Sequence, residues 1–303
     1  MKKQSLHLPP PADELFETVY GALYDFLRPI TPGNVVGRLG GGTALAAQWG
    51  HRRSTDIDIT VPEGTGLNIY EPGRDEALIK RMAQLGAERV SVRYRTFIFQ
   101  FPNGKLDIVE KEMPIRRGQR PADVDGKEML VHSNGQILSG KLVGRGNLNV
   151  ARDVFDIAVA VREDPDALQA AINHMETGYR EDVAYRIAAY GAQFRKEAPE
   201  GILDVTPQWL PLLSTAPEVA AQAIADLTYS AIELAYGGGC VALKLRSPGD
   251  DRAREYRYPT GQALVDALPE LGLEPHFMAF HGRSERMIEV VNRDIARAVR
   301  EGR

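Results

Sequence analysis

The sequence of 303 residues contains one cysteine, Cys240, so no disulfide can form within the chain. It has no run of about 18 apolar residues, the length that a membrane-spanning helix requires. No apolar segment follows the positively charged start Met1-Lys2-Lys3, which argues against a secretory signal. We therefore expect a cytoplasmic protein that does not enter a membrane and works in a reducing compartment.

The chain also lacks an excess of positive charge. Its 37 Lys and Arg residues stand against 41 Asp and Glu residues, which gives a net charge of −4. This balance argues against a general nucleic-acid coat protein, which would be basic overall, but it allows an RNA substrate held by a local basic patch. The length and the 43% hydrophobic content predict one large domain or two ordinary ones.

Two regions differ in their hydrophobic pattern, and together they predict an α+β fold. Residues 1–125 carry several alternating, strand-like segments, which predict a mixed sheet with flanking helices. Residues 126–303 are mainly helical in pattern. The helices expected there cover 136–143, 152–161, 165–175, 180–195, 218–235, 262–268 and 285–300, with a short strand over 241–245. The boundary is placed in the polar segment that ends near residue 125.

The segment Gly40-Gly41-Gly42-Thr43 lies between an expected strand over 35–39 and an expected helix over 43–49. A glycine-rich turn that enters a helix exposes backbone N–H groups, which can bind a phosphate. The same turn also suits a dinucleotide-binding Rossmann unit. That fingerprint, however, has a third glycine where Leu45 stands, and it uses one acid rather than a pair. A tight turn without a ligand is a third interpretation.

Asp56 and Asp58 lie two residues apart in an expected strand over 54–61, so they share a face. Aspartate is depleted in strands, and two on one face repel each other unless a cation offsets their charge. Hard carboxylate oxygens are ligands that Mg²⁺ prefers. The pair therefore predicts a site for Mg²⁺ or Mn²⁺, and a solvated edge strand is the alternative.

A third carboxylate for this site should come from another strand. Asp107, between Leu106 and Ile108 in the strand expected over 105–109, is the candidate. We expect it to help hold the metal and to act as general base toward an attacking hydroxyl. An edge aspartate beside the hairpin turn expected at 102–104 is the alternative interpretation.

The glycine turn, the Asp-x-Asp pair and the later aspartate together resemble the nucleotidyltransferase superfamily of DNA polymerase beta-like folds. Two longer segments, Gly41-Gly42-Thr43-Ala44-Leu45 and His51-Arg52-Arg53-Ser54-x-Asp56-Ile57-Asp58, resemble its AbiEii/AbiGii branch, which includes the MenT-type toxins. Two further motifs of that branch have counterparts in the right order, Lys141-Leu142 and Arg152-Asp153-Val154-Phe155-Asp156. The resemblance covers roughly residues 35–160.

The resemblance implies roles for these residues. The catalytic set would be Asp56, Asp58, Asp107, Lys141 and Asp156, with the first three holding the metal. The nucleotide-binding set would be Gly41, Gly42, Thr43, Ser54, Lys141 and Asp153, with Lys141 on the phosphates. Asp153 and Asp156 share one helical face, where Asp156 would orient Lys141 or the nucleotide. An exposed helix lysine and a helix N-terminal charge are the plain alternatives for Lys141 and Asp153.

The resemblance also implies a function. The chain would be the toxin of a toxin–antitoxin system, with a cognate antitoxin protein as partner. It would transfer NMP from an NTP to an acceptor, the 3′ end of tRNA, and so block translation and growth. Seven arginines could contact the phosphates of that acceptor: Arg52, Arg53, Arg93, Arg95, Arg116, Arg117 and Arg120.

Three alternatives to this function stay open, and the resemblance also implies one form of regulation. The acceptor could instead be a protein hydroxyl or a small molecule, and a non-catalytic nucleotide-binding regulator is a third interpretation. In MenT-type relatives the residue matching Ser54 can be phosphorylated. A phosphate there would add negative charge beside the carboxylates and repel the NTP. A plain polar residue at the start of the strand is the alternative for Ser54.

Overall fold

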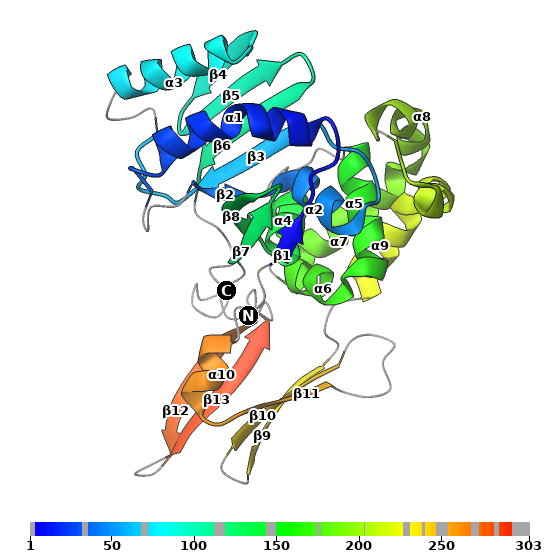
Figure 1. Cartoon of the computed structure of the whole chain (residues 1–303). Coiled ribbons are helices and arrows are strands. Elements are labelled where there is room, and N and C mark those ends of the chain that lie inside the picture. Colours follow the sequence, from blue (N-terminus) through cyan, green and yellow to red (C-terminus); the bar gives the residue numbers. More distant parts are fainter. Residues whose placement is uncertain are drawn as a thin grey trace. The chain divides into compact units, whose positions relative to one another are not determined.

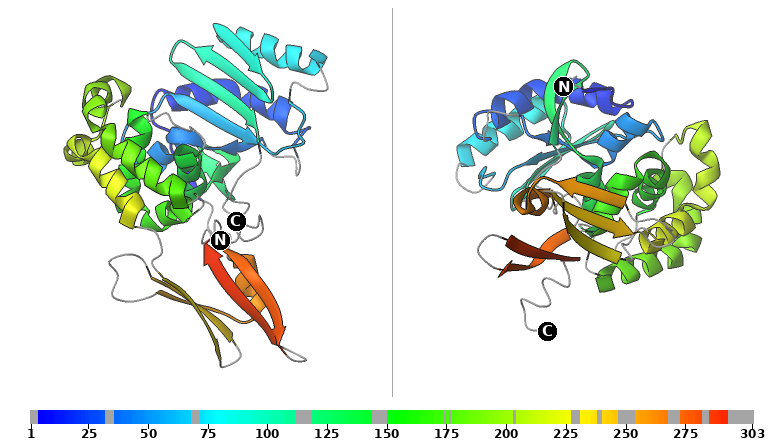
Figure 2. Two further views of the ribbon diagram at one scale, coloured as in Figure 1. Left: turned by 180° about the vertical axis from the view of Figure 1, so that it is seen from behind. Right: turned by 90° about the horizontal axis from the view of Figure 1, so that it is seen from below.

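The computed structural model in Figures 1 and 2 describes residues 4–31, 36–67, 72–111, 119–143, 150–173, 175, 177–202, 204–226, 231–237, 240–246, 254–267, 273–281 and 285–292. The chain divides into two compact units. Unit 1 comprises Met1–Ile137 with Glu197–Pro211, and unit 2 comprises Leu138–Lys196 with Leu212–Arg303. The first division between the units falls after Ile137, and a second segment of the chain belongs to unit 1.

An eight-stranded mixed sheet forms the centre of unit 1, with the strand order β1-β7-β8-β2-β3-β6-β5-β4. The strands are β1 (Gln4–Leu6), β2 (Arg38–Leu39), β3 (Asp56–Val61), β4 (Arg89–Arg93), β5 (Thr96–Phe101), β6 (Gly104–Glu110), β7 (Gln119–Val124) and β8 (Lys127–His132). Strands β3 and β6 run parallel, whereas β2 is antiparallel to β3 and β5 to β6. The predicted mixed sheet with flanking helices is confirmed.

The two faces of this sheet differ in polarity. The odd-numbered residues of β3 are buried, and its even-numbered residues begin with Asp56 and Asp58 on the opposite face. Helix α1 (Ala12–Leu27) covers the apolar face, where the rings of Phe26 and Phe97 meet edge to face at 6.4 Å. Helix α3 (Pro72–Gln84) packs against α1 (Figure 1). Helix α2 (Gly41–Trp49) lies beside β3.

A two-residue turn, Pro102-Asn103, joins β5 to β6 and confirms the expected hairpin. Gly104, the first residue of β6, has a second reason to be glycine. A Cβ atom there would lie 2.0 Å from the carbonyl oxygen of Thr55. The missing side chain therefore lets the start of β6 approach the start of β3 closely, which aligns the residues that follow on both strands.

Unit 2 begins with packed helices and continues with strands. Its helices include α5 (Ala151–Glu163), α6 (Pro165–Asn173), α7 (Thr177–Ala189) and α9 (Ala216–Asp226), with α5 and α7 both packed against α9. Helix α4 (Asn134–Val143), helix α8 (Gly191–Gly201) and the 3-10 helix η1 (Pro207–Ser214) span the divisions between units. The later elements are β9 (Ala231–Gly237), β10 (Cys240–Arg246), β11 (Arg254–Tyr258), α10 (Gly261–Ala267), β12 (Leu273–His281) and β13 (Glu285–Asn292).

The later part of unit 2 corrects two predictions of helix. The helix expected over 218–235 ends at Asp226, and residues 231–235 belong to β9 instead. The helix expected over 285–300 is wrong for 285–292, which form β13 paired antiparallel with β12; residues 293–300 lie outside the described part of the chain. Within the described residues, the helices are too short or too polar to cross a bilayer.

Candidate functional site

The glycine turn of unit 1 contacts the carboxylate of Asp58 directly. A Cβ atom on Gly41 would lie 1.7 Å from Oδ2 of Asp58, and the φ angle of Gly41 is +66°. The backbone N–H of Gly40 donates to the carbonyl oxygen of Asp58 at 2.9 Å. First-turn N–H groups have no acceptor within a helix, and among the described residues no side chain caps α2. The turn therefore presents N–H donors next to a carboxylate of the sheet.

The register of β3 and β6 brings the three predicted carboxylates together. Asp58 pairs with Asp107 across the parallel strands, and Asp56 pairs with Lys105. All four side chains project from one face of the sheet because paired residues in adjacent strands point the same way. Asp56 and Asp107 are both largely buried. This face therefore gathers three negative charges beside the glycine turn.

Lys105 neutralises part of this charge and was missed by the sequence analysis. Its Nζ lies 2.5 Å from Oδ2 of Asp107 and 3.8 Å from Oδ2 of Asp56. Burial acts to lower the pKa of Lys105, but the hydrogen bond to Asp107 and the charges of Asp56 and Asp58 outweigh it and raise the pKa. Lys105 thus places a cation inside the carboxylate cluster. The alternation that unites Asp56 with Asp58 also predicts Lys105 beside Asp107.

The cluster has the donor atoms, but not the present arrangement, of a metal site. Among the described residues, no group of three His, Cys, Asp or Glu side chains is arranged to hold a metal ion. Lys105 lies between two of the carboxylates instead. Within the described part of the chain, Oδ1 of Asp107 is buried and accepts no hydrogen bond. Three carboxylates with an unused buried oxygen form an oxygen-rich donor set of the kind that Mg²⁺ or Mn²⁺ binds.

Thr43 and Ser54 lie inside the protein rather than on the surface of the site. The Oγ1 of Thr43 lies 2.7 Å from Oγ of Ser54 and also hydrogen-bonds the carbonyl oxygen of Asp56. Ser54 is 7% exposed and Thr43 is fully buried. Their hydroxyls therefore tie α2 to the start of β3. A kinase could reach Ser54 only after this contact opened.

His132, at the end of β8, lies against Gly40 of the glycine turn. A Cβ atom on Gly40 would lie 2.8 Å from Cδ2 of His132. The Nδ1 of His132 lies 3.0 Å from Oε1 of Gln136, which also accepts the backbone N–H of Ser133. Nδ1 therefore carries the proton. The pKa of His132 is lowered to about 4, chiefly by burial; the hydrogen bond to Gln136 opposes this shift, and the charges of Lys111 and Arg38 add to it.

The predicted residues of unit 2 form a buried ion cluster of their own. Lys141 on α4 pairs with Asp153 and Asp156 on α5, and its Nζ lies 2.9 Å from Oδ2 of Asp156. The three side chains are 7%, 6% and 0% exposed, respectively. Lys141 is therefore not an exposed helix lysine, whereas Asp153 lies in the first turn of α5, as the alternative of a helix N-terminal charge expects. The Lys-Leu and Arg-Asp-x-x-Asp motifs therefore meet within one unit.

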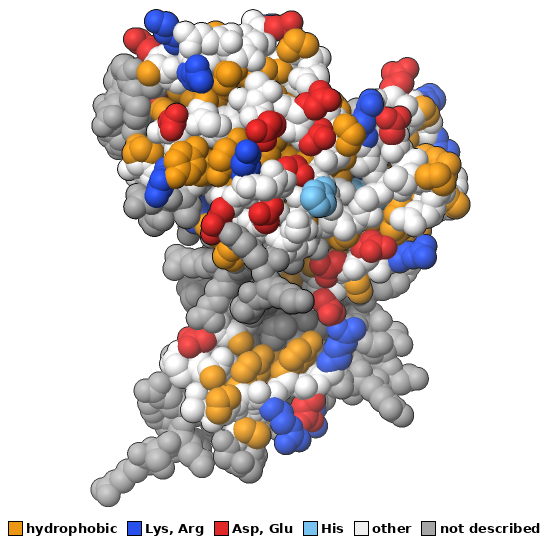
Figure 3. Space-filling model, in the orientation of Figure 1, with side chains coloured by type: hydrophobic (Ala, Val, Ile, Leu, Met, Phe, Trp, Pro, Cys, Tyr) orange, Lys and Arg blue, Asp and Glu red, His pale blue; other side chains and the backbone are white. Residues whose placement is uncertain are grey.

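The arginines proposed to contact an acceptor have differing surroundings. Arg52 is buried, Arg53 pairs with Asp204 at 3.0 Å, and Arg95 pairs with Glu63 at 2.5 Å. Arg93 is exposed on β4, whereas Arg116 and Arg117 lie outside the described residues. On the face drawn in Figure 3, acidic and basic side chains are interspersed rather than gathered into a basic patch. An RNA bound to this face would therefore contact separate basic side chains rather than a continuous basic patch.

The ion cluster of unit 2 predicts a large effect on stability. Lys141→Met leaves two buried carboxylates without their cation, and we expect a loss of about 3–5 kcal/mol in the free energy of unfolding. The matched control is the triple substitution Lys141→Met, Asp153→Asn, Asp156→Asn, which removes the charges together and should recover most of the loss. Denaturant titration measures both. Equal stability of Lys141→Met and the wild-type chain would contradict the buried cluster.

His132 predicts a pH dependence with a defined sign. Its pKa is about 4 in the folded chain against 6.5 when unperturbed, so the unfolded chain binds more protons between these values. The free energy of unfolding should fall as the pH drops from 6.5 toward 4, by up to about 3 kcal/mol from this group. The check is denaturation of wild type and His132→Phe at both pH values. The difference between the two chains should change with pH, and a constant difference would refute the assignment.

Comparison with known proteins gives one family match and two matches among the solved structures. The family model described as nucleotidyl transferase AbiEii toxin, type IV TA system, matches residues 35–227. The crystal structure of a candidate nucleotidyltransferase from H. pylori is 19% identical, with a TM-score of 0.42, and the match covers 72% of this chain and 96% of that one. JHP933 from Helicobacter pylori has the same identity, TM-score and coverage of this chain, with 93% of its own chain covered. No curated protein sequence matches.

The family match confirms the resemblance read from the motifs and extends it. The motifs cover residues 35 to about 160, whereas the family model continues to residue 227, through the helices α5 to α9. The enzyme class predicted from the motifs is confirmed with it. Because residues 35–227 are more than half of its length, this chain belongs to the AbiEii family of nucleotidyltransferase toxins of type IV toxin–antitoxin systems.

Proposed function

We propose that the chain transfers NMP from an NTP to the 3′ hydroxyl of an RNA, with tRNA as the acceptor, and thereby blocks translation and growth. One observation carries the proposed chemistry. The glycine turn contacts Asp58 at Gly41, and Asp58 pairs in register with Asp107. Phosphate-binding N–H groups and a carboxylate set thus lie side by side. The tRNA acceptor, and an antitoxin protein as partner, come from the family resemblance.

Asp56, Asp58 and Asp107 would hold a divalent cation, for which Mg²⁺ and Mn²⁺ are the candidates. The support is the shared face of the three carboxylates and the buried Oδ1 of Asp107, which accepts no hydrogen bond from the described residues. When bound, the cation would supply positive charge to the phosphates during the transfer. Lys105 would leave its present place between Asp107 and Asp56 to make room for it.

The remaining chemistry falls to groups of the chain. The N–H groups at Gly41, Gly42 and Thr43 would bind the triphosphate and retain the departing pyrophosphate. Asp107 would accept the proton of the attacking 3′ hydroxyl. The new bond joins that oxygen to the α-phosphorus as the bond from the α-phosphorus to the pyrophosphate oxygen breaks. The roles that the resemblance gives to Lys141, Asp153, Asp156 and Ser54 remain predictions.

Lys105 should control how tightly the carboxylates bind a metal. Lys105→Met removes a cation that competes for Asp56 and Asp107, so the Kd for Mn²⁺ should fall about tenfold, equivalent to about 1.4 kcal/mol. Without metal, the same variant should unfold more easily than wild type because its carboxylates repel one another. Isothermal titration calorimetry with Mn²⁺, and denaturation in EDTA, measure the two effects.

The matched control for Lys105→Met is Lys127→Met. Lys127 pairs with Glu17 at 3.2 Å and has a similarly exposed side chain, but it lies on β8 and pairs with α1. It should leave the Kd for Mn²⁺ unchanged. An unchanged Kd in both variants would show that Lys105 does not compete with a metal.

Incubation of the chain with each α-labelled NTP, Mg²⁺ or Mn²⁺, and total tRNA tests the proposed function. We expect label on RNA, and a loss of at least about a hundredfold in Asp58→Asn and Asp107→Asn, since each removes a carboxylate used in the transition state. Asp25→Asn, an exposed site on α1, is the matched control and should keep full activity. If the label appeared on protein instead of RNA, the proposed RNA acceptor would be wrong, but the chain would still be a nucleotidyltransferase.

A further inference from the structure

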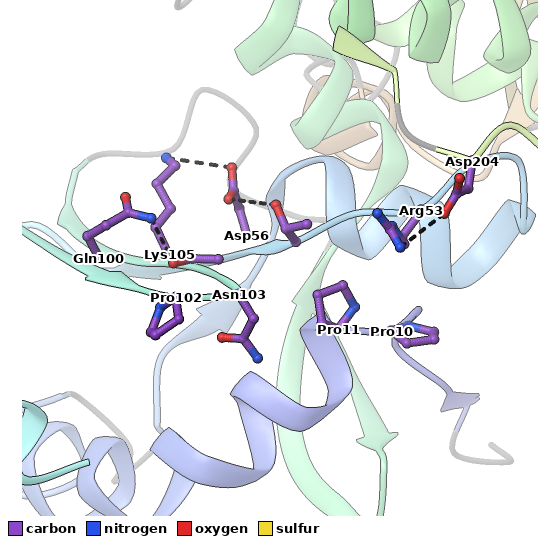
Figure 4. Close-up of a pocket in the computed structure, with 11 residues that line it drawn as sticks. Pro10, Pro11, Arg53, Asp56, Gln100, Pro102, Asn103, Lys105 and Asp204 are labelled. Carbon is purple, nitrogen blue, oxygen red and sulfur yellow. Dashed lines mark hydrogen bonds and ion pairs between the residues drawn. The ribbon is translucent and has the colours of Figure 1, made fainter. Parts of the chain in front are cut away.

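A pocket of about 740 Å³ opens within unit 1 at the start of β3 and β6 (Figure 4). Asp56 and Lys105 line one part of it, so the pocket reaches the carboxylate cluster. Pro102 and Asn103 of the β5–β6 turn line another part, and Pro11 lines a third. Its volume falls within the range of about 300–1,000 Å³ that is usual for sites of small organic ligands.

We propose that this pocket binds the 3′-terminal nucleotide of the RNA acceptor, and this inference rests on the proposed function. The position of the pocket relative to the glycine turn supports this assignment. The glycine turn contacts Asp58, whereas the pocket is lined by Asp56, the preceding residue on the same face of β3. Alternate residues of a strand lie about 6.6 Å apart. The phosphate-binding turn and the pocket therefore approach the carboxylates at two successive positions along the strand.

In-line transfer of a nucleotidyl group requires that arrangement. The attacking hydroxyl and the leaving pyrophosphate must lie on opposite sides of the phosphorus atom. The turn at Gly41 is the place for the pyrophosphate, so the acceptor hydroxyl has to arrive from another direction. The pocket offers such a direction because Asp56 lines it. Lys105, which also lines the pocket, pairs with Asp107, the proposed general base.

The chemistry of the lining suits a nucleotide. Pro10, Pro11 and Pro102 present rigid apolar rings, which can cover the face of a base. The amide of Asn103 can donate to and accept from the edge of a base, whereas Nε2 of Gln100 already donates to the carbonyl oxygens of Phe101 and Gly104, which leaves its Oε1 as an acceptor. Figure 4 shows Pro102 and Asn103 projecting from the β5–β6 turn on the same side as Pro11. An apolar surface next to amides accommodates a base better than a free inorganic anion.

Arg53 and Asp204 form the polar wall of the pocket and can control the RNA backbone. Their ion pair, at 3.0 Å, joins side chains that are 42% and 70% exposed. An exposed pair of this kind contributes only about 0–1 kcal/mol. Arg53 can therefore exchange Asp204 for a phosphate at little cost. Asp204 in turn repels a phosphate, so the pair sets the strength of RNA binding.

The test measures binding rather than turnover. Fluorescence anisotropy with a labelled, short single-stranded RNA that ends in a 3′ hydroxyl gives the affinity of each variant. Arg53→Gln should weaken RNA binding about tenfold, the size expected for one charged contact, and reduce the salt slope by about 0.7. Asp204→Asn should strengthen RNA binding. Neither variant should change the Kd for an NTP measured with Mn²⁺.

The control and the opposing outcomes separate this inference from the proposed function. Arg81→Gln, on α3 against α1, removes an exposed arginine outside the pocket and should leave RNA affinity as in wild type. Unchanged RNA affinity in Arg53→Gln, or an equal loss of NTP affinity, overturns the pocket assignment while transfer of label to RNA continues. A wild-type chain that neither binds RNA nor labels it overturns the proposed function and the pocket together.

Discussion

The repulsion among three carboxylates on one face of β3 and β6 is the constraint on which the rest of unit 1 depends. Like charges at adjacent positions of a sheet destabilise it. The sheet tolerates them because its other face is apolar and covered by α1, and because the ammonium group of Lys105 lies between Asp107 and Asp56. Gly41 follows from the same constraint, since Asp58 occupies the space where a Cβ atom would lie. Negative charge is therefore held in place before any substrate arrives.

The motif residues of unit 2 follow the same physical logic, because a lysine again lies between two aspartates. There Lys141 pairs with Asp153 and Asp156, and all three side chains are almost completely buried. Loss of one partner would leave uncompensated charge inside the protein. A loss of activity in a Lys141 variant would therefore report folding as well as any contact with a nucleotide. The triple substitution that removes all three charges is needed to separate these effects.

Much of unit 1 could be predicted from the sequence, because alternation in strands and the glycine turn are local signals. Lys105 could have been found by the same rule, since it stands two residues before Asp107. His132 could not, because only the fold brings it to Gly40, far away in the sequence. The helix expected at 285–300 failed because Ile288 and Val290 also alternate as in a strand, and they are β-branched. Short apolar segments of this kind do not distinguish the two structures.

Asp56 and Asp58 belong to one motif, yet their surroundings give them different work in the proposed reaction. Asp58 is fixed by the glycine turn, through Gly41 against its carboxylate and the N–H of Gly40 on its carbonyl oxygen. Asp56 instead lines the pocket and lies 3.8 Å from Nζ of Lys105. In the proposed reaction, Asp58 would lie beside the phosphates of the NTP and Asp56 beside the acceptor. The triphosphate is the same in every NTP, so the site of Asp58 would not need to distinguish one NTP from another. In the proposed reaction, the acceptor would then be selected at Asp56, which lines the pocket.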